Sequence, residues 1–320
     1  MQNDGGLSPI SMTQWRSQPQ AFADALHASF VRFGFAVVRD HGLDAATIER
    51  ATSAAEAFFA APLQRKQPFL KEGQAGARGY TPFRVETAKG ATRADLKEFW
   101  HVGRDLPAGH PSAAVMPPNV WPDEPAEFRP AVSALFSAMD SLGMELLAAT
   151  AMGLHLPSDW FGDKAGVGDS ILRLAHYPPV EDGDAGVRAA AHEDINVITL
   201  LLGAEEPGLQ ILARDGRWLA VNPPPGHLVV NVGDMLQRLT NHVLPSTTHR
   251  VVNPPAERRR RARLSTPFFV HFNPDFEIRT LASCIGDQDR YPQPITAHAF
   301  LQQRLREIGL KKELIPSSTA

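Results

Sequence analysis

Two histidines and one aspartate in the C-terminal half of the chain have the residue types and spacing of a metal site. His192 and Asp194 are separated by one residue, and His249 follows much later in the sequence. Side chains two positions apart in an extended segment point to the same side, so His192 and Asp194 can meet at one point. Together with His249 they supply two imidazole nitrogens and one carboxylate oxygen. This set suits Fe(II) and leaves the opposite side of the ion open for chemistry.

A His-x-Asp pair is common by chance, so the surrounding segments decide how much weight it carries. The segments that follow it are an apolar run, a Pro-Gly turn, a second apolar run that ends in Gly-Asp, a Thr-His-Arg phrase and an Arg-x-Ser pair. In order these are 197–202, 207–211, 229–234, 246–252 and 263–265. Upstream, the pattern from Phe22 to Phe59 predicts a helix, a strand and a second helix.

This ordered series of motifs spans nearly the whole chain and resembles the Fe(II)- and 2-oxoglutarate-dependent dioxygenases, in the branch similar to isopenicillin N synthase. The resemblance implies a mainly β fold with flanking helices. Its centre is a distorted double-stranded β-helix, or jelly-roll barrel, behind a helical N-terminal region. It also implies that His192, Asp194 and His249 are the Fe(II) ligands and the catalytic centre.

The co-substrate site implied by the resemblance lies in the Arg-x-Ser pair. Arg263 and Ser265 hold the far carboxylate of 2-oxoglutarate, and a planar guanidinium can bind a carboxylate through two parallel hydrogen bonds. The alternative is that Arg263 belongs to the exposed basic run 258–261. Where plant relatives have Asn-Tyr-Tyr before a Pro-Pro pair, this chain has Ala175, His176 and Tyr177, so Tyr177 alone carries over as a co-substrate contact.

The reaction implied by the resemblance couples oxidative decarboxylation of 2-oxoglutarate by dioxygen to hydroxylation of a small-molecule metabolite, with desaturation or cyclisation as variants. One alternative is a 2-oxoglutarate-independent Fe(II) oxidase like isopenicillin N synthase, which uses the same Arg-x-Ser pair for its peptide substrate. An ethylene-forming type of enzyme is another. A non-catalytic ligand-binding barrel is the alternative from a different class, and a complete set of three metal ligands argues against it.

Substrate contacts are expected from two places. The resemblance places the 78–86 segment and the following Asp95-Leu-Lys-Glu-Phe99 along the mouth of the active site, which makes Tyr80, Arg84 and Glu86 candidate substrate contacts. For Arg84 and Glu86, an ordinary solvated loop is an equal alternative.

The second place is Arg173, two residues before Ala175, which is expected to point into the barrel. A buried arginine needs either a protein partner or an anion. We favour an anion, and therefore a substrate that carries a carboxylate.

Several other polar residues are expected to have structural roles. His176, His242 and His271 have no paired spacing with a carboxylate, so ordinary hydrogen bonds are expected for them. Asn231 and Asp234 are expected to fix the turn that leads toward His249, with at most an indirect part at the metal.

Four regions are predicted along the chain: an N-terminal dioxygenase region at 8–118, a helix packing on the barrel at 119–165, the jelly-roll core at 166–275, and a C-terminal helix and tail at 276–320. The long helix is expected around Val132–Leu147 with its end near Gly153, and the last one over Ala297–Leu310. Asp44 is expected to cap the second N-terminal helix.

The composition is that of a globular enzyme. The chain has 320 residues, a net charge of −3 and a hydrophobic content of 43%, which give no reason to expect a nucleic-acid partner. The single cysteine, Cys284, rules out an intrachain disulfide. The pattern contains neither a secretory signal nor a membrane-spanning run. We therefore expect a cytoplasmic protein with no obligate protein partner.

Overall fold

The strands form two sheets that face each other, plus one small ribbon. The computed structural model describes residues 7–71, 76–86, 94–179, 187–202, 208–253 and 260–307. The major sheet has nine strands: β1 (Pro9–Ser11), β2 (Phe35–Arg39), β3 (Gly79–Thr81), β4 (Glu98–Gly103), β5 (Ile171–Tyr177), β7 (Ile198–Leu202), β10 (Leu228–Val232), β12 (Arg263–Ser265) and β13 (Pro267–Val270). The minor sheet contains β6 (Ala189–His192), β8 (Leu209–Leu212), β9 (Trp218–Ala220) and β11 (His249–Val251). The ribbon pairs β14 (Glu277–Ile278) with β15 (Ile295–Thr296).

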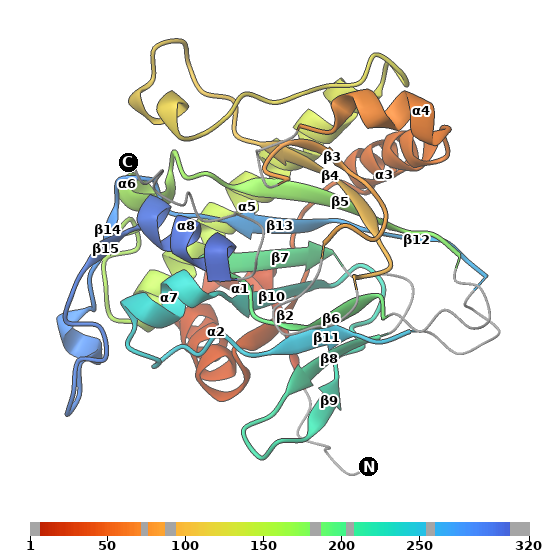
Figure 1. Cartoon of the computed structure of the whole chain (residues 1–320). Helices are drawn as coiled ribbons and strands as arrows, with labels where there is room; N and C mark the ends of the chain where they lie inside the picture. Colours follow the sequence, from red (N-terminus) through yellow and green to blue (C-terminus); the bar gives the residue numbers. More distant parts are fainter. Residues whose placement is uncertain are drawn as a thin grey trace, which may run out of the picture.

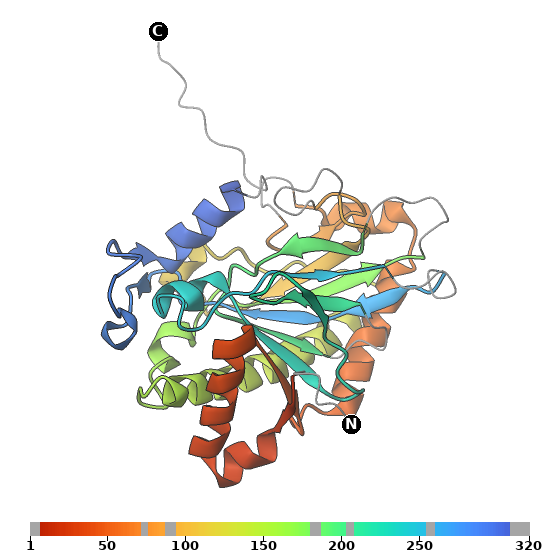
Figure 2. The same cartoon turned by 90° about the horizontal axis from the view of Figure 1, so that it is seen from below.

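The larger helices cover the outer face of the major sheet. The helices are α1 (Met12–Ser17), α2 (Pro19–Phe33), α3 (Ala45–Phe59), α4 (Leu63–Lys66), α5 (Phe128–Gly153), α6 (Gly162–Ala165), α7 (Asp234–Leu239) and α8 (Ala297–Glu307). In Figure 2, α2 (red) and α5 (yellow-green) lie on one side of the strands and α8 (blue) lies on the other. Figure 1 shows the minor sheet beside the β2–β10 end of the major sheet.

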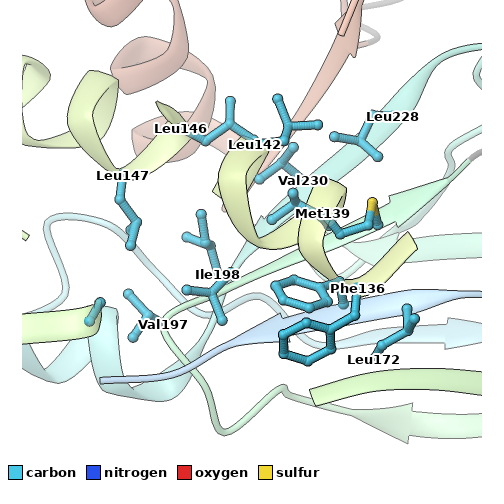
Figure 3. Close-up of a cluster of buried hydrophobic side chains, with 14 of the residues drawn as sticks. Phe136, Met139, Leu142, Leu146, Leu147, Leu172, Val197, Ile198, Leu228 and Val230 are labelled. Atoms are coloured by element: carbon cyan, nitrogen blue, oxygen red, sulfur yellow. The ribbon is translucent and has the colours of Figure 1, made fainter. Parts of the chain in front are cut away.

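Strand alternation divides the side chains of the major sheet between two environments. Residues such as Leu172, Ile198 and Val230 face the helices and belong to the main hydrophobic core. Figure 3 shows them against the apolar stripe of α5, which includes Phe136 and Met139. Burying such side chains contributes about 1.5–3 kcal/mol each, so this packing fixes the sheet on its helical support.

The opposite face of the major sheet points toward the minor sheet. Phe35, Val37 and Val229 from β2 and β10 pack with Leu209 and Ile211 of β8 in a second, smaller core. Two sheets closed over a shared interior in this way form the jelly-roll barrel that the sequence predicts. Polar side chains occupy the remainder of that inner face, and these build the site described below.

The predicted elements around the barrel are confirmed, with small shifts of their ends. Asp44 caps α3 by accepting a hydrogen bond from the Thr47 backbone N–H. The long helix spans Phe128–Gly153 and ends at the predicted residue. The last helix begins at Ala297 as predicted and is described to Glu307, and residues 308–310 of that prediction lie outside the described residues.

Gly34 ends α2 in a way that also positions the segment before His249. Its φ is +67°, a left-handed conformation that glycine adopts without strain. A Cβ at this position would lie 2.3 Å from Thr247 Oγ1 and 2.5 Å from the Pro245 carbonyl oxygen. Only a glycine therefore allows the 245–247 segment to pass so close to the start of β2.

One helix in the described part of the chain, α5, is long and apolar enough to cross a membrane by length and composition. Half of its most apolar window is buried inside the protein, and the helix packs against α2, α3 and the major sheet. We therefore describe α5 as the central core helix of the fold.

Candidate metal centre

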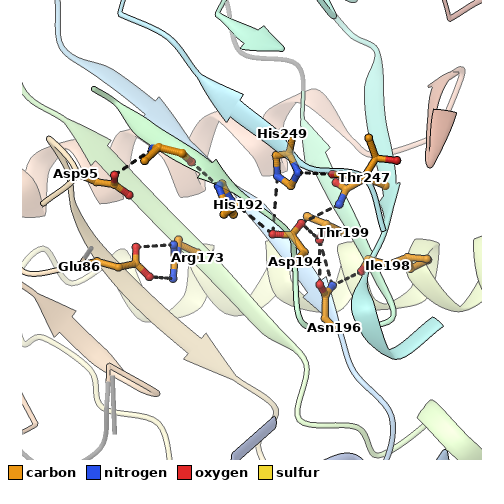
Figure 4. Close-up of polar contacts among 12 residues, drawn as sticks. Glu86, Asp95, Arg173, His192, Asp194, Asn196, Ile198, Thr199, Thr247 and His249 are labelled. Atoms are coloured by element: carbon orange, nitrogen blue, oxygen red, sulfur yellow. Dashed lines mark hydrogen bonds and ion pairs between the residues drawn. The ribbon is translucent and has the colours of Figure 1, made fainter. Parts of the chain in front are cut away.

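The three predicted ligands meet at one point between the two sheets. The ligand atoms of His192, Asp194 and His249 all lie within 4.8 Å of one another. The Nε2 atoms of His192 and His249 are 3.7 Å and 3.9 Å from Asp194 Oδ1. Such spacing suits three atoms that share one ion, and Figure 4 shows the two imidazoles and the carboxylate converging. The sequence prediction that these residues come together is confirmed.

Hydrogen bonds to the backbone fix which nitrogen of each histidine can bind a metal. His192 Nδ1 lies 2.8 Å from the Ala190 carbonyl oxygen, and His249 Nδ1 lies 3.1 Å from the Thr247 carbonyl oxygen. A carbonyl only accepts, so each Nδ1 carries the proton and donates it. Each Nε2 then presents its lone pair to the centre of the trio, which is the arrangement that metal-binding histidines use.

Asp194 is held so that one of its two carboxylate oxygens remains for a metal. Oδ2 accepts hydrogen bonds from Thr199 Oγ1 (2.6 Å) and Asn231 Nδ2 (2.8 Å). Oδ1 faces the two histidines. The sequence predicts at most an indirect part for Asn231 at the metal, and the structure gives it this supporting role. Sequence reasoning missed Thr199, because a threonine within an apolar strand carries no distinguishing signal.

The protonation states of His192 and Asp194 suit a divalent cation. Burial and the nearby His249 lower the pKa of His192 to about 4, so this imidazole is neutral at pH 7. Burial acts to raise the pKa of Asp194, but the imidazoles and the hydrogen bonds from Asn231 and Thr199 outweigh it and lower that pKa. A neutral imidazole and an ionised carboxylate are the forms that bind metal, so these two donors suit Fe(II).

The predicted co-substrate residues lie together on the inner face of the major sheet. Arg263 and Ser265 of β12 stand directly opposite Tyr177 and Ala175 of β5. All three predicted contacts are buried, and the Arg263 guanidinium carbon lies 5.4 Å from the centre of the Tyr177 ring. In contrast, Arg260 and Arg261 are exposed. Among the described arginines of this stretch, Arg263 is therefore the one that points into the barrel.

Arg173 also points into the barrel, but it has a protein partner. Its Nη1 and Nη2 donate to both carboxylate oxygens of Glu86 at 3.1 Å and 3.0 Å, and its Nε donates to His101 Nε2 at 2.7 Å. The guanidinium carbon lies 4.2 Å from the centre of the Phe99 ring. We expected Arg173 to bind a substrate anion. The structure shows instead that Glu86 supplies the negative charge that pairs with Arg173.

The position of Arg173 relative to the metal trio follows from strand pairing. Its guanidinium carbon lies 5.4 Å from the centre of the Phe269 ring, and Phe269 stands directly opposite Thr199, which donates to Asp194. Arg173 and Glu86 therefore lie beside the metal site, across one aromatic ring from it. Figure 4 shows this pair on the same side of the sheet as His192.

Glu86 and Arg173 belong to a larger charged cluster that sequence reasoning missed. Lys97 Nζ lies 2.6 Å from Glu86 and 2.8 Å from Asp95. Burial acts to raise the pKa of Glu86, but Arg173 and Lys97 outweigh it and hold that pKa well below its usual value. The alternation Asp95-Leu-Lys97 was a usable signal, because it repeats the one-residue spacing of the metal motif directly before β4.

The two other predicted substrate contacts, Tyr80 and Arg84, differ in where the structure places their side chains. Tyr80 stands opposite Trp100 in the main core, and its hydroxyl donates to Glu98 at 2.5 Å. This places Tyr80 on the helix-covered face, away from the metal trio, so its predicted substrate contact is wrong. Arg84 is exposed, and its guanidinium carbon lies 5.2 Å from the Phe83 ring centre. Its substrate role stays a prediction.

The remaining histidines have ordinary hydrogen-bonded roles, as expected. His176 Nδ1 lies 2.8 Å from Glu98 on the helix-covered face, and His242 lies 2.6 Å from the Tyr291 hydroxyl. His271 is buried, and its Nδ1 donates to the Phe269 carbonyl. Among the described residues, the His192 trio is the group of His, Cys, Asp or Glu side chains close enough together to share an ion.

Comparison with known proteins agrees with this site. Residues 7–124 match the family described as the N-terminal region of non-haem dioxygenases in morphine synthesis, and residues 168–272 match the 2OG-Fe(II) oxygenase superfamily. The 2-oxoglutarate-Fe(II) type oxidoreductase hxnY of Emericella nidulans is 34% identical over 90% of this chain and 86% of its own.

Solved structures extend the likeness to the fold. A putative 2OG-Fe(II) oxygenase family protein from Caulobacter crescentus is 55% identical with a TM-score of 0.89, covering 94% of this chain and 99% of its own. A Neurospora crassa protein solved in complex with alpha-KG and thymine is 27% identical with a TM-score of 0.82, covering 96% and 98%. The chain therefore belongs to the 2OG-Fe(II) oxygenase superfamily.

Proposed function

We propose that this 2-oxoglutarate-dependent Fe(II) dioxygenase hydroxylates a small, uncharged polar metabolite. The observation that carries the catalytic part is the His192, Asp194 and His249 trio with both Nδ1 atoms bonded to backbone carbonyls. A bound Fe(II) ion supplies the activation of dioxygen, coupled to decarboxylation of 2-oxoglutarate to succinate and carbon dioxide. The chain's own residues bind and orient the reactants and exclude water from them.

We assign the far carboxylate of 2-oxoglutarate to Arg263 and Ser265, with Tyr177 beside them. Their burial on one inner face supports this assignment, since a buried guanidinium binds a carboxylate far more strongly than an exposed one. Thr199 and Asn231 keep the Asp194 carboxylate in a single orientation. The site is thereby prepared before any reactant arrives.

The charge balance beside the metal trio supports an uncharged substrate. Arg173 and Lys97 are two cations, and Glu86 and Asp95 are two carboxylates, so this cluster has no surplus charge to attract a substrate carboxylate. Phe269 adds an apolar ring beside them. Such a surface suits a planar molecule with hydrogen-bonding edges. The similar Neurospora crassa protein was solved with thymine, an uncharged molecule of this kind.

The decisive test measures succinate formed from 2-oxoglutarate under air with Fe(II), alone and with a panel of matched substrate pairs. Each pair has the same ring and the same oxidisable methyl group, with and without a carboxylate elsewhere on the ring, such as thymine against 5-methylorotate. We expect the uncharged member of a pair to stimulate succinate formation more than its carboxylated partner. A preference for the carboxylated members would instead support the prediction that Arg173 binds a carboxylate of the substrate.

Succinate formation also separates the alternatives. A 2-oxoglutarate-independent oxidase consumes dioxygen with its substrate but forms no succinate. A non-catalytic barrel neither consumes dioxygen nor forms succinate. Ethylene in the headspace would identify the ethylene-forming type.

We also propose a place for the chain within its superfamily and within the cell. The N-terminal match supports the branch similar to isopenicillin N synthase. A cytoplasmic location remains our proposal, which cell fractionation tests.

A further inference from the structure

Asp95 is a deeply buried carboxylate that lies next to the strand carrying His192. Only 3% of its surface is exposed. Its Oδ1 accepts a hydrogen bond from the Ala190 backbone N–H at 3.1 Å, and its Oδ2 lies 2.8 Å from Lys97 Nζ. A buried carboxylate is costly unless its oxygens have partners. Both oxygens of Asp95 have such a partner, so this carboxylate connects the segment before β4 to β6 by specific polar contacts.

The position of β6 explains why this contact matters. β6 is the edge strand of the minor sheet and pairs there with β11. Among the described strands, none pairs with its other edge in that sheet, and a buried backbone N–H without an acceptor costs free energy. Asp95 supplies the missing acceptor to Ala190. The Asp95 carboxylate therefore accepts the hydrogen bond from β6 that the backbone of a neighbouring strand would otherwise accept.

Ala190 also orients the metal ligand itself. Its carbonyl oxygen accepts the hydrogen bond from His192 Nδ1 at 2.8 Å. One residue therefore binds Asp95 through its N–H and His192 through its carbonyl. A shift of Ala190 turns the His192 ring and moves Nε2 away from the point shared with Asp194.

We propose that Asp95, held by Lys97, is a positioning residue that sets the orientation of His192. This inference rests on the proposed role of His192 as a metal ligand. Lys97 also contacts Glu86, which binds Arg173. A continuous chain of ion pairs and hydrogen bonds thus runs from Arg173 through Glu86, Lys97, Asp95 and Ala190 to His192. Figure 4 shows Asp95 near the Glu86–Arg173 pair, and His192 next to Asp194.

The test compares the metal-binding properties of Asp95→Ala and Asp95→Asn, with Co(II) as the probe under anaerobic conditions. We expect Asp95→Ala to weaken Co(II) binding by about 10-fold, the lower end of what loss of an outer partner costs a metal site. We also expect the visible d–d spectrum of Co(II) bound to Asp95→Ala to shift, because the ligand geometry changes. Asp95→Asn keeps an acceptor for Ala190 and therefore retains most of the affinity. In the metal-free protein, the Ala190 amide hydrogen exchanges faster in Asp95→Ala than in wild type.

The matched control is Glu98→Ala. Glu98 is likewise a buried carboxylate paired with a lysine, Lys66, but it lies on the helix-covered face. We expect Glu98→Ala to lower the thermal unfolding temperature and leave Co(II) affinity and spectrum unchanged. If Asp95→Ala fails to fold, Lys97→Met serves as the second variant, with a change of the same sign and smaller size.

Three outcomes have distinct meanings. Wild-type Co(II) affinity and spectrum in a folded Asp95→Ala or Lys97→Met variant overturns the proposal. The same spectral change in Glu98→Ala overturns it too, because the effect is then a general loss of packing. Unchanged Co(II) binding in His192→Ala instead overturns the ligand assignment on which the proposal rests.

Discussion

His192 and His249 stand directly opposite each other on neighbouring antiparallel strands, with their ring centres 4.4 Å apart. This pairing brings together two ligands that are far apart in sequence. It also means that the metal site depends on the register of β6 against β11. A slip of one residue would point one imidazole to the other face of the sheet.

The first prediction concerns the metal ligands. His192→Ala abolishes the weak visible charge-transfer band that forms when Fe(II) and 2-oxoglutarate are added anaerobically, because two protein ligands cannot hold the chelate in place. The control is His242→Asn, which changes a histidine hydrogen-bonded to Tyr291 away from the trio. A normal band in the His192 variant contradicts the assignment.

The second prediction concerns the support of Asp194. Thr199→Val removes the hydroxyl that donates to Asp194 Oδ2 and keeps the shape of the side chain. We expect Fe(II) affinity to fall by about 10-fold, measured by competition with a chelator. Thr150→Val is the matched control, since Thr150 is equally buried but donates to a helix carbonyl in α5. Equal affinities in the two variants would show that the hydroxyl does not tune the site.

The third prediction concerns the co-substrate. Arg263→Ala weakens 2-oxoglutarate binding by about 2–4 kcal/mol, a factor on the order of 100, because a buried carboxylate loses its charged partner. Fe(II) binding without co-substrate is retained. Arg261→Ala, which changes an exposed arginine of the same stretch, leaves the Kd for 2-oxoglutarate unchanged. Titration of the charge-transfer band with 2-oxoglutarate measures both variants.

The fourth prediction concerns pH. Arg173 and Lys97 hold the pKa of Glu86 below its ordinary value of 4.5, despite burial. A carboxylate whose pKa is lower in the folded state stabilises the fold above the unfolded pKa and loses this effect as the pH falls. The stability advantage of wild type over Glu86→Gln is therefore present at pH 7 and shrinks below about pH 4.5. Urea unfolding of both proteins from neutral to acidic pH measures the difference, and a constant difference contradicts the ion-pair explanation.

The fifth prediction tests the corrected position of Tyr80. Tyr80→Phe removes a hydrogen bond to Glu98 and lowers the free energy of unfolding by about 1 kcal/mol. The KM of the substrate and the rate of succinate formation stay unchanged, since the hydroxyl lies on the helix-covered face. A raised KM for the substrate at an unchanged free energy of unfolding would show that Tyr80 contacts the substrate.

The sequence by itself determined the elements and the metal motif. Helix ends at Gly34, Asp44 and Gly153 depend on local backbone chemistry, which neighbouring residues fix. His192 and Asp194 share one face because their spacing is local as well. The family's motif order then supplied His249, Arg263 and the jelly-roll fold.

Only the tertiary structure decided which partners the inward charges have. Arg173 faces inward as the sequence predicts, but Glu86 comes from a distant segment, and no local rule predicts that the two meet. Tyr80 was misplaced for the same reason, since the face of a three-residue strand depends on its pairing with β4. Long-range pairing sets these contacts, because a side chain's energy inside a barrel depends on its neighbours in space and not on its neighbours in sequence.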